Sequence, residues 1–257
     1  MDMESLLKTH SSKVYNLAYR ITNNIQDAED IVQATFLKVF EKMDTFRGES
    51  DISTWIYRIA LNEGLGVVRK LHLDQAHFDQ VDEEMNHSSV EDLPADIRDI
   101  YTSPDKQYLL KLMENEIKEG CHKFMLFRIT EEQRVVFIFR IILDFSLKEI
   151  SEILQIDIGS VKSRLSRAKQ NLQKHVKDRC QWHNEKADCS CVKCMGFAFK
   201  ETPDLIYRMR DIINRPEYYR EAAEQVNSRG DLEDIFHRLP RLEYKILPIQ
   251  KYLKKTL

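Results

Sequence analysis

The residues best suited to chemistry are cysteines and a histidine gathered in one short segment of the second half of the chain. Cys180 and His183 form a pair with two residues between them, and Cys191 and Cys194 form a second pair of the same spacing. Each pair can present two ligands to one ion, and two pairs complete the tetrahedron that zinc prefers. The sequence therefore predicts a Cys₃His site for one zinc ion, or another thiophilic metal, with Cys189 as an additional candidate ligand.

The same thiols could instead carry redox chemistry, because neighbouring cysteines can be oxidised to a disulfide. Metal binding and redox switching both stay open at this point. A zinc enzyme would need an open coordination position and a general base beside the metal. No such arrangement appears in the sequence, so we do not expect an enzyme.

The composition is that of a cytoplasmic protein. The N-terminal residues are acidic where a signal peptide is basic, and no apolar run approaches the ~18–20 residues that a membrane span needs. The 257 residues include only 7 glycines and 6 prolines, and long segments carry apolar residues at helical spacing. We therefore predict an all-α protein without membrane association.

A helix-turn-helix over residues 146–177 is the element expected to position the basic residues of the chain. Ser146 and Glu149 form a capping box at the start of its first helix, and Val161 and Leu165 anchor its second helix inward. The second helix of such a motif enters the major groove of DNA with its first residues at the base edges. The residues expected on its outer surface, where they can reach bases and phosphates, are Ser160, Lys162, Ser163, Arg164, Ser166, Arg167 and Lys169.

Charge is distributed unevenly along the chain, although the net charge is only −3. Residues 157–179 carry seven bases and two acids, whereas residues 74–99 carry nine acids and one base. A basic run is often only a solvated helix face. Here it coincides with a capped helix, a short turn and hydroxyl side chains, and this combination favours DNA binding. The acidic stretch has few large apolar residues and predicts a flexible linker over residues 73–104.

Three helices are predicted in the first 70 residues. The second begins with acidic residues, which are favourable at a helix N-terminus whatever else they do. A polar loop at residues 46–50 precedes the third helix. Phe46 begins this loop, and Trp55 lies near the start of the helix. Aromatic residues at such positions suit core packing as well as stacking on a base, so the residues alone leave both roles open.

Together these segments resemble the bacterial sigma factors of the extracytoplasmic-function (ECF) group. Residues 27–36, 46–50 and 54–62 resemble the second conserved region of that family. The segments that resemble its fourth conserved region are residues 131–134, 146–150 and 159–168. The segments occur in the family's order.

The resemblance implies a role for each segment. The acidic helix would dock on the clamp helices of the large catalytic subunit of RNA polymerase through Asp27, Glu29, Asp30 and Gln33. The loop and third helix would hold a flipped base of the −10 promoter element by stacking it on aromatic and guanidinium planes. The residues implied there are Phe46, Arg47, Gly48, Ser50, Trp55, Tyr57, Arg58 and Asn62. The helix-turn-helix would read the −35 element.

Two features depart from the family's pattern. Glu63, Gly64 and Gly66 stand where the family carries basic and apolar helix formers. Each glycine weakens a helix by ~1 kcal/mol relative to alanine, and an acid repels phosphate. The chain also continues past residue 180, near which such factors usually end.

We therefore expect two helical sigma domains, a flexible linker and a helical tail. Region 2 would occupy residues 1–72, the linker 73–104, region 4 residues 105–179, and the tail with its metal-binding cluster 180–257. The predicted function is a sigma factor that directs the RNA polymerase core to promoter DNA. We expect a metal- or redox-responsive tail to regulate it, and a separate anti-sigma factor is a further possible partner. The alternative is a helix-turn-helix regulator that is not a polymerase subunit and would not need the features of residues 5–70.

Overall fold

The computed structural model describes residues 3–70, 80–81, 83–85, 87–181, 184, 186–187, 189–201, 204–217 and 236. The regular elements among these residues are helices, and the one isolated bridge joins Cys180 and Cys189. The predicted all-α class is confirmed. None of the helices in this part of the chain is both long and apolar enough to cross a membrane. The described residues fall into two compact units, one built from 3–70 and 130–168, the other from residues between 80 and 129, between 169 and 217, and Phe236.

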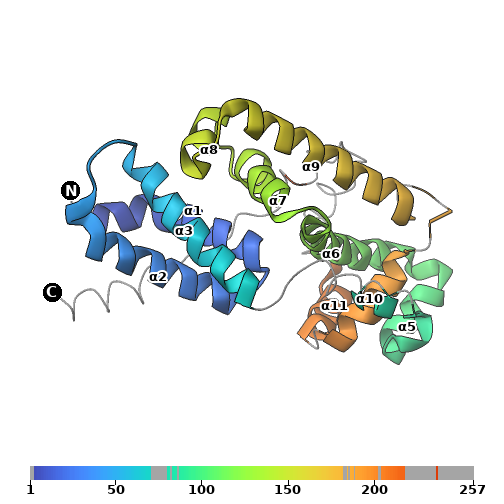
Figure 1. The fold of residues 1–257 in the computed structure, drawn as a ribbon. Coiled ribbons are helices and arrows are strands. Elements are labelled where there is room, and N and C mark those ends of the chain that lie inside the picture. Colours follow the sequence, from blue (N-terminus) through green and yellow to red (C-terminus); the bar gives the residue numbers. More distant parts are fainter. Residues whose placement is uncertain are drawn as a thin grey trace. The chain divides into compact units, whose positions relative to one another are not determined.

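The first unit begins with three packed helices, α1 (Met3–Thr22), α2 (Ile25–Lys42) and α3 (Ile52–Lys70) (Figure 1). The side chain of Asn24 accepts a hydrogen bond from the backbone N–H of Asp27 at 3.0 Å, which caps α2. Leu17, Phe36 and Ile56, one from each helix, are fully buried in the core. Gly64 of α3 faces Ile21, and a Cβ at position 64 would lie 3.3 Å from that side chain.

The same unit contains α7 (Glu131–Phe137), the π-helix η5 (Ile138–Ile142) and α8 (Leu147–Leu154), and α9 (Ile158–Arg179) begins in it. The predicted capping box at α8 is present. Glu149 N–H donates to Ser146 Oγ at 3.2 Å, and Ser146 N–H donates to a Glu149 carboxylate oxygen at 2.7 Å. Gln155 ends α8 in the left-handed conformation with φ of 56°, and this sharp ending turns the chain toward α9.

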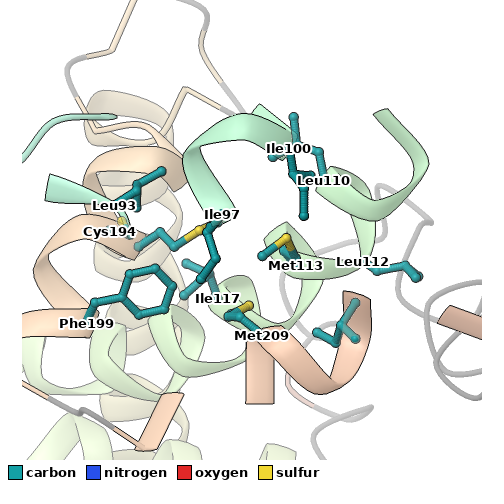
Figure 2. Packing of buried hydrophobic residues seen from close by; sticks show 12 residues of the cluster. Leu93, Ile97, Ile100, Leu110, Leu112, Met113, Ile117, Cys194, Phe199 and Met209 are labelled. Carbon is teal, nitrogen blue, oxygen red and sulfur yellow. The ribbon is translucent and has the colours of Figure 1, made fainter. Parts of the chain in front are cut away.

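Helices from two distant parts of the chain build the second unit. The first part gives η2 (Val90–Asp92), α5 (Ala95–Thr102), η3 (Pro104–Lys106), α6 (Gln107–Met125) and η4 (Leu126–Arg128). The tail gives α10 (Cys191–Glu201) and α11 (Asp204–Asn214), and both pack against α6. Figure 2 shows the apolar cluster that they share, to which Ile97, Met113, Phe199 and Met209 contribute.

A flexible linker was predicted over residues 73–104. The structure instead has helices within residues 88–104, and these helices pack into this cluster. Ile97 and Ile100 lie on one face of α5 and are 1% and 3% exposed. Their burial depends on α6 and the tail, and partners so distant in sequence are not visible in the local composition. Residues 73–79 of the predicted linker lie outside the described residues.

The tail approaches η2 very closely at Gly196 of α10. A Cβ at this position would lie 3.1 Å from the backbone oxygen of Ser89 and 3.4 Å from the side chains of Ser88 and Asp92. Ser89 and Asp92 form their own capping box, in which Ser89 N–H donates to the Asp92 carboxylate at 2.8 Å. The glycine thus lets a helix of the tail rest on a capped turn of the earlier segment.

Candidate nucleic-acid interface

The predicted recognition helix, α9, has a buried face and an exposed face in its first half. Val161 and Ala168 are fully buried, as predicted for Val161, whereas Leu165 is only half-buried. Of the outward residues, Lys162, Ser163, Ser166 and Arg167 are exposed, and Ser160, Arg164 and Lys169 are half-buried. This surface is basic and rich in hydroxyl groups, as direct contact with bases and phosphates requires.

Two acids contact the predicted DNA-binding residues and hold their positions. Arg164 Nη2 lies 3.2 Å from a carboxylate oxygen of Glu132 in α7. Asp157 accepts hydrogen bonds from both the N–H and the hydroxyl of Ser160, at 2.9 Å and 2.6 Å, so it caps the start of α9. These bonds lower the pKa of Asp157. Asp157 was not among the predicted residues, although an aspartate at this position is a common N-cap.

The acids predicted to meet the polymerase lie on α2 away from its buried residues. Asp30 and Gln33 are exposed, and Asp27 and Glu29 are half-buried. Ala28 and Ile31, which lie between them in the sequence, face the core. The carboxylates therefore form an accessible acidic surface in the first turns of the helix.

The loop before α3 brings the two predicted stacking residues together. The rings of Phe46 and Trp55 lie 5.2 Å apart, centroid to centroid, at an angle of 38°, and both are half-buried. Arg47 and Gly48 are exposed beside them, and Gly48 has a φ of +71°, which favours glycine. Asp51 accepts a hydrogen bond from the N–H of Ser53 at 2.7 Å and so fixes the start of α3.

Tyr57 and Arg58, which were also predicted to contact the −10 element, lie elsewhere. Tyr57 is only 2% exposed, and its hydroxyl lies 3.1 Å from Nδ1 of His10. Arg58 donates hydrogen bonds to the backbone oxygens of Glu152 and Ile153 in α8, at 2.6 Å and 3.2 Å. In this structure Tyr57 is a core residue, and Arg58 would have to leave α8 to meet DNA. Ser50 is half-buried and Asn62 is exposed.

The glutamate that departs from the family pattern also has a partner. Glu63 forms an ion pair with Lys38 of α2 at 2.6 Å. Its charge is therefore balanced within the helical bundle. Gly64 next to it gives α1 room to approach α3 through Ile21. Both residues have a structural role in the packing of these helices.

The predicted metal ligands are not gathered in one place by the described residues. Among these residues, no three histidine, cysteine or acidic side chains form a ready metal-binding group. Cys194 is buried, Cys180 and Cys191 are half-buried, and His183 lies outside the described residues. The metal site at Cys180, His183, Cys191 and Cys194 stays a prediction.

Cys194 instead has sulfur neighbours that were not in the predicted ligand set. Its Sγ lies 3.4 Å from that of Cys189 and donates to the Met85 thioether at 3.4 Å. It is also hydrogen-bonded to Cys121, and these bonds and burial raise the pKa of Cys194. Cys121 was not predicted as a member of the group because no other cysteine is near it in the chain. Its spacing of four from Ile117 nevertheless places it on the buried face of α6.

Two family models match the two helical segments described above. The family model described as Sigma-70 region 2 matches residues 6–72, and the model described as Sigma-70, region 4 matches residues 125–172. The two models cover the first three helices and the helix-turn-helix, in that order. The matched segments are therefore similar to the two DNA-reading regions of Sigma-70 factors.

Individual proteins are similar to about two thirds of this chain. ECF RNA polymerase sigma factor SigW of Bacillus subtilis is 29% identical over 173 residues, which are 67% of this chain and 88% of SigW. RNA polymerase sigma-H factor of Pseudomonas aeruginosa is 28% identical over 171 residues, 66% of this chain and 83% of that protein. A solved structure of the sigma factor RpoE of Bartonella quintana, in complex with the anti-sigma factor NepR, is 26% identical with a TM-score of 0.44, covering 68% of this chain and 97% of that one. Over about two thirds of its length, the chain is thus similar to RNA polymerase sigma factors.

Proposed function

We propose that this sigma factor directs the RNA polymerase core to specific promoters in the cytoplasm by reading two DNA elements. The observation that carries the proposal is that both sigma regions match one chain, in the family's order, and that α2 and α9 each carry exposed charged residues. The relatives are named as RNA polymerase sigma factors. In this proposal the polymerase supplies the chemistry and the chain supplies the choice of promoter.

The −35 element would be read by the exposed face of α9. Lys162 and Arg167 are exposed there together with the hydroxyls of Ser163 and Ser166. The capping box of α8 and the Asp157 cap of α9 fix the two helices of the motif, so the side chains are presented by a defined backbone.

The −10 element would be captured by the loop before α3. Phe46 and Trp55 form an aromatic surface on which an unstacked base can lie, and Arg47 is exposed beside it. The acidic surface of α2, with Asp30 and Gln33 exposed, would meet the clamp helices of the polymerase. The clamp-helix surface that binds these carboxylates would need basic residues opposite them.

The tail would regulate this activity. α10 and α11 pack on α6, and α6 leads through η4 to the cap of α7 at Thr130. A change in the packing of the tail would therefore act on the helix that leads into α7. Zinc or another thiophilic metal bound by the tail cysteines is part of this proposal, and so is a separate anti-sigma factor like the one in the complex of the Bartonella protein.

The alternative of a regulator that works without being a polymerase subunit does not account for region 2. Run-off transcription with core polymerase, with and without the full chain, tests the proposal. We expect transcripts with discrete start sites only when the chain is present. DNA binding by the isolated chain without any stimulation of core polymerase would overturn the proposal and favour the alternative.

A matched pair of variants sharpens this experiment at the predicted docking surface. Asp30→Lys reverses an exposed charge of α2, whereas Glu41→Lys makes the same change at an exposed position near the other end of that helix. We expect Asp30→Lys to weaken binding to core polymerase far more than Glu41→Lys does. Equal effects of the two variants would contradict docking through the first turns of α2.

A further inference from the structure

Four sulfur atoms from three separate segments meet in the second unit, and we call them the sulfur cluster. They belong to Met85, to Cys121 of α6, to Cys189 just before α10, and to Cys194 of α10. Cys194 is the shared member, at 3.4 Å from both the Cys189 and the Met85 sulfurs and hydrogen-bonded to Cys121. The sulfur cluster thus brings three thiols together although Cys121 is far from the others in sequence.

The members of the sulfur cluster differ in access to solvent. Cys194 is 9% exposed and belongs to the apolar cluster drawn in Figure 2. Cys121 and Cys189 are half-buried. A small oxidant therefore reaches Cys189 or Cys121 before it reaches Cys194.

The backbone around Cys189 leaves this residue outside the regular helix. Cys189 N–H donates to the Arg179 oxygen at 3.1 Å, and Cys189 accepts from Gln181 N–H at 2.9 Å. The first turn of α10 begins only beyond it, where Cys194 N–H donates to the Ser190 oxygen at 3.1 Å. Closing a disulfide of about 2.05 Å from a 3.4 Å contact requires a shift of about 1.4 Å, which such a connection can supply more easily than a helix interior.

We propose that Cys189 and Cys194 are an oxidation site, at which a hydroperoxide converts the two thiols into a disulfide. The Cys189 thiolate attacks the outer peroxide oxygen, the O–O bond breaks, and a sulfenic acid forms as water or an alcohol leaves. The Cys194 sulfur then attacks the Cys189 sulfur, the S–O bond breaks, and a second water leaves with the Cys194 proton. Two thiols lose two electrons and two protons in all, and the peroxide gains them.

Forming the disulfide changes which hydrogen bonds Cys194 can make. As a thiol, Cys194 donates a hydrogen bond to the Met85 thioether and is hydrogen-bonded to Cys121. It therefore links α10 to α6 and to the segment that contains Met85. As half of a disulfide it has no hydrogen to donate. Oxidation therefore weakens the attachment of α10 at the sulfur cluster. Any effect on transcription rests on the proposed function, whereas the thiol chemistry does not.

The experiment uses the full chain, reduced and freed of metal with a chelator, then treated with one equivalent of hydrogen peroxide. Intact mass should fall by about 2 mass units, and two thiols should become inaccessible to alkylation. Lys193 lies between the two cysteines, so trypsin should release Cys189 and Cys194 in separate peptides that stay linked until reduction. Because Cys191 shares the first of these peptides, Cys191→Ser is the matched control.

We expect the linked peptides in the wild type and in Cys191→Ser, and their loss in Cys189→Ser and Cys194→Ser. Cys189 is half-buried, so Cys189→Ser keeps the test valid even if the buried Cys194→Ser fails to fold. A linkage that persists in Cys189→Ser, a disulfide between Cys121 and Cys194 instead, or oxidation only to sulfinic acid would each overturn the proposal. Tight binding of zinc to the sulfur cluster that blocks oxidation in untreated protein would favour metal binding there and also count against it.

A transcription assay on the same samples separates this proposal from the proposed function. If the reduced protein fails to stimulate core polymerase, the proposed function fails while the peptide linkage still decides the oxidation site. If the reduced protein is active, we expect peroxide to change the activity of the wild type and of Cys191→Ser but not that of Cys189→Ser. The two proposals therefore fail by different observations.

Discussion

Arg58 of α3 donates a hydrogen bond from Nε to the backbone oxygen of Ile153, near the end of α8, at 3.2 Å. Its Nη2 donates to the neighbouring oxygen of Glu152 at 2.6 Å. Carbonyl groups in the last turn of a helix lack partners within the helix and carry a partial negative charge, so a guanidinium is a favourable partner for them. A residue expected at the DNA surface thus connects region 2 to the first helix of the helix-turn-helix.

Replacing Arg58 by alanine should lower the free energy of unfolding by about 1–2 kcal/mol, because two charge-assisted hydrogen bonds are lost. Chemical denaturation followed by circular dichroism measures the change. Arg69→Ala is the control on the same helix, since its ion pair with Glu131 is at the surface, where the arginine side chain is 67% exposed. We expect a loss below about 1 kcal/mol for that variant. Equal losses in both variants would contradict a special role of Arg58.

His175 of α9 should make stability depend on pH in a defined window. Burial, helped by the charges of Arg128 and Arg179, lowers the pKa of His175 to about 4. An unfolded histidine titrates near 6.5, so between about pH 6.5 and 4 the unfolded chain binds a proton that the folded chain does not. Stability from this group is present above that window and is lost as the pH falls through it.

The variant His175→Asn tests this dependence, because asparagine stays neutral throughout. We expect its unfolding free energy to vary less than that of the wild type between pH 6.5 and 4, measured by urea denaturation at fixed ionic strength. His87→Asn is a matched control, since His87 is exposed. Identical pH curves for the wild type and His175→Asn would show that the half-buried site of His175 does not lower its pKa.

Arg167→Ala should weaken binding to a promoter duplex that carries the −35 element by roughly 5-fold to 100-fold, the range for one lost base or phosphate contact. Lys174→Ala removes one exposed charge from the same helix outside the predicted surface and is the matched control. Fluorescence anisotropy at two salt concentrations gives the affinities and the salt dependence. A comparable weakening by Lys174→Ala would mean that only the total charge of the helix matters.

Phe46→Ala should reduce the formation of the melted promoter complex while leaving binding to the −35 duplex unchanged. Stacking on one aromatic ring contributes about 1–3 kcal/mol for a single-stranded base, so a reduction of roughly 5-fold to 100-fold is expected. Potassium permanganate reactivity of the −10 region, with core polymerase present, reports the melted state. Phe46→Tyr keeps the ring and should retain most of the activity. Wild-type melting by Phe46→Ala would exclude Phe46 from the base-binding surface.

Elements whose signals are local in sequence could be predicted well. The capping box of Ser146 and Glu149 occurs where the pattern placed it, because a cap depends on residues only three apart. The alternation of buried and exposed residues in the first half of α9 follows from helical periodicity for the same reason. These local signals were enough to find both sigma regions.

Features that depend on distant segments could not be predicted in this way. The burial of Ile97 requires α6 and the tail, and the contact between Cys121 and Cys194 joins segments that no spacing rule connects. Arg58 and Tyr57 show the same limit, since their surroundings come from α8 and α1. Composition described the acidic segment as a linker because it contains few apolar residues, yet those few are the ones that pack.

The close approach of α10 to η2 at Gly196 has a consequence for the inheritance of the tail. A Cβ at position 196 would press on the backbone oxygen of Ser89, so glycine is required there as long as the capped turn of Ser89 and Asp92 keeps its place against α10. The turn at η2 and the glycine of α10 should then be kept or lost together among proteins descended from this chain. A glycine two residues after a cysteine, paired with an upstream serine and aspartate three apart, is a joint signature with which related tails can be sought in other genomes.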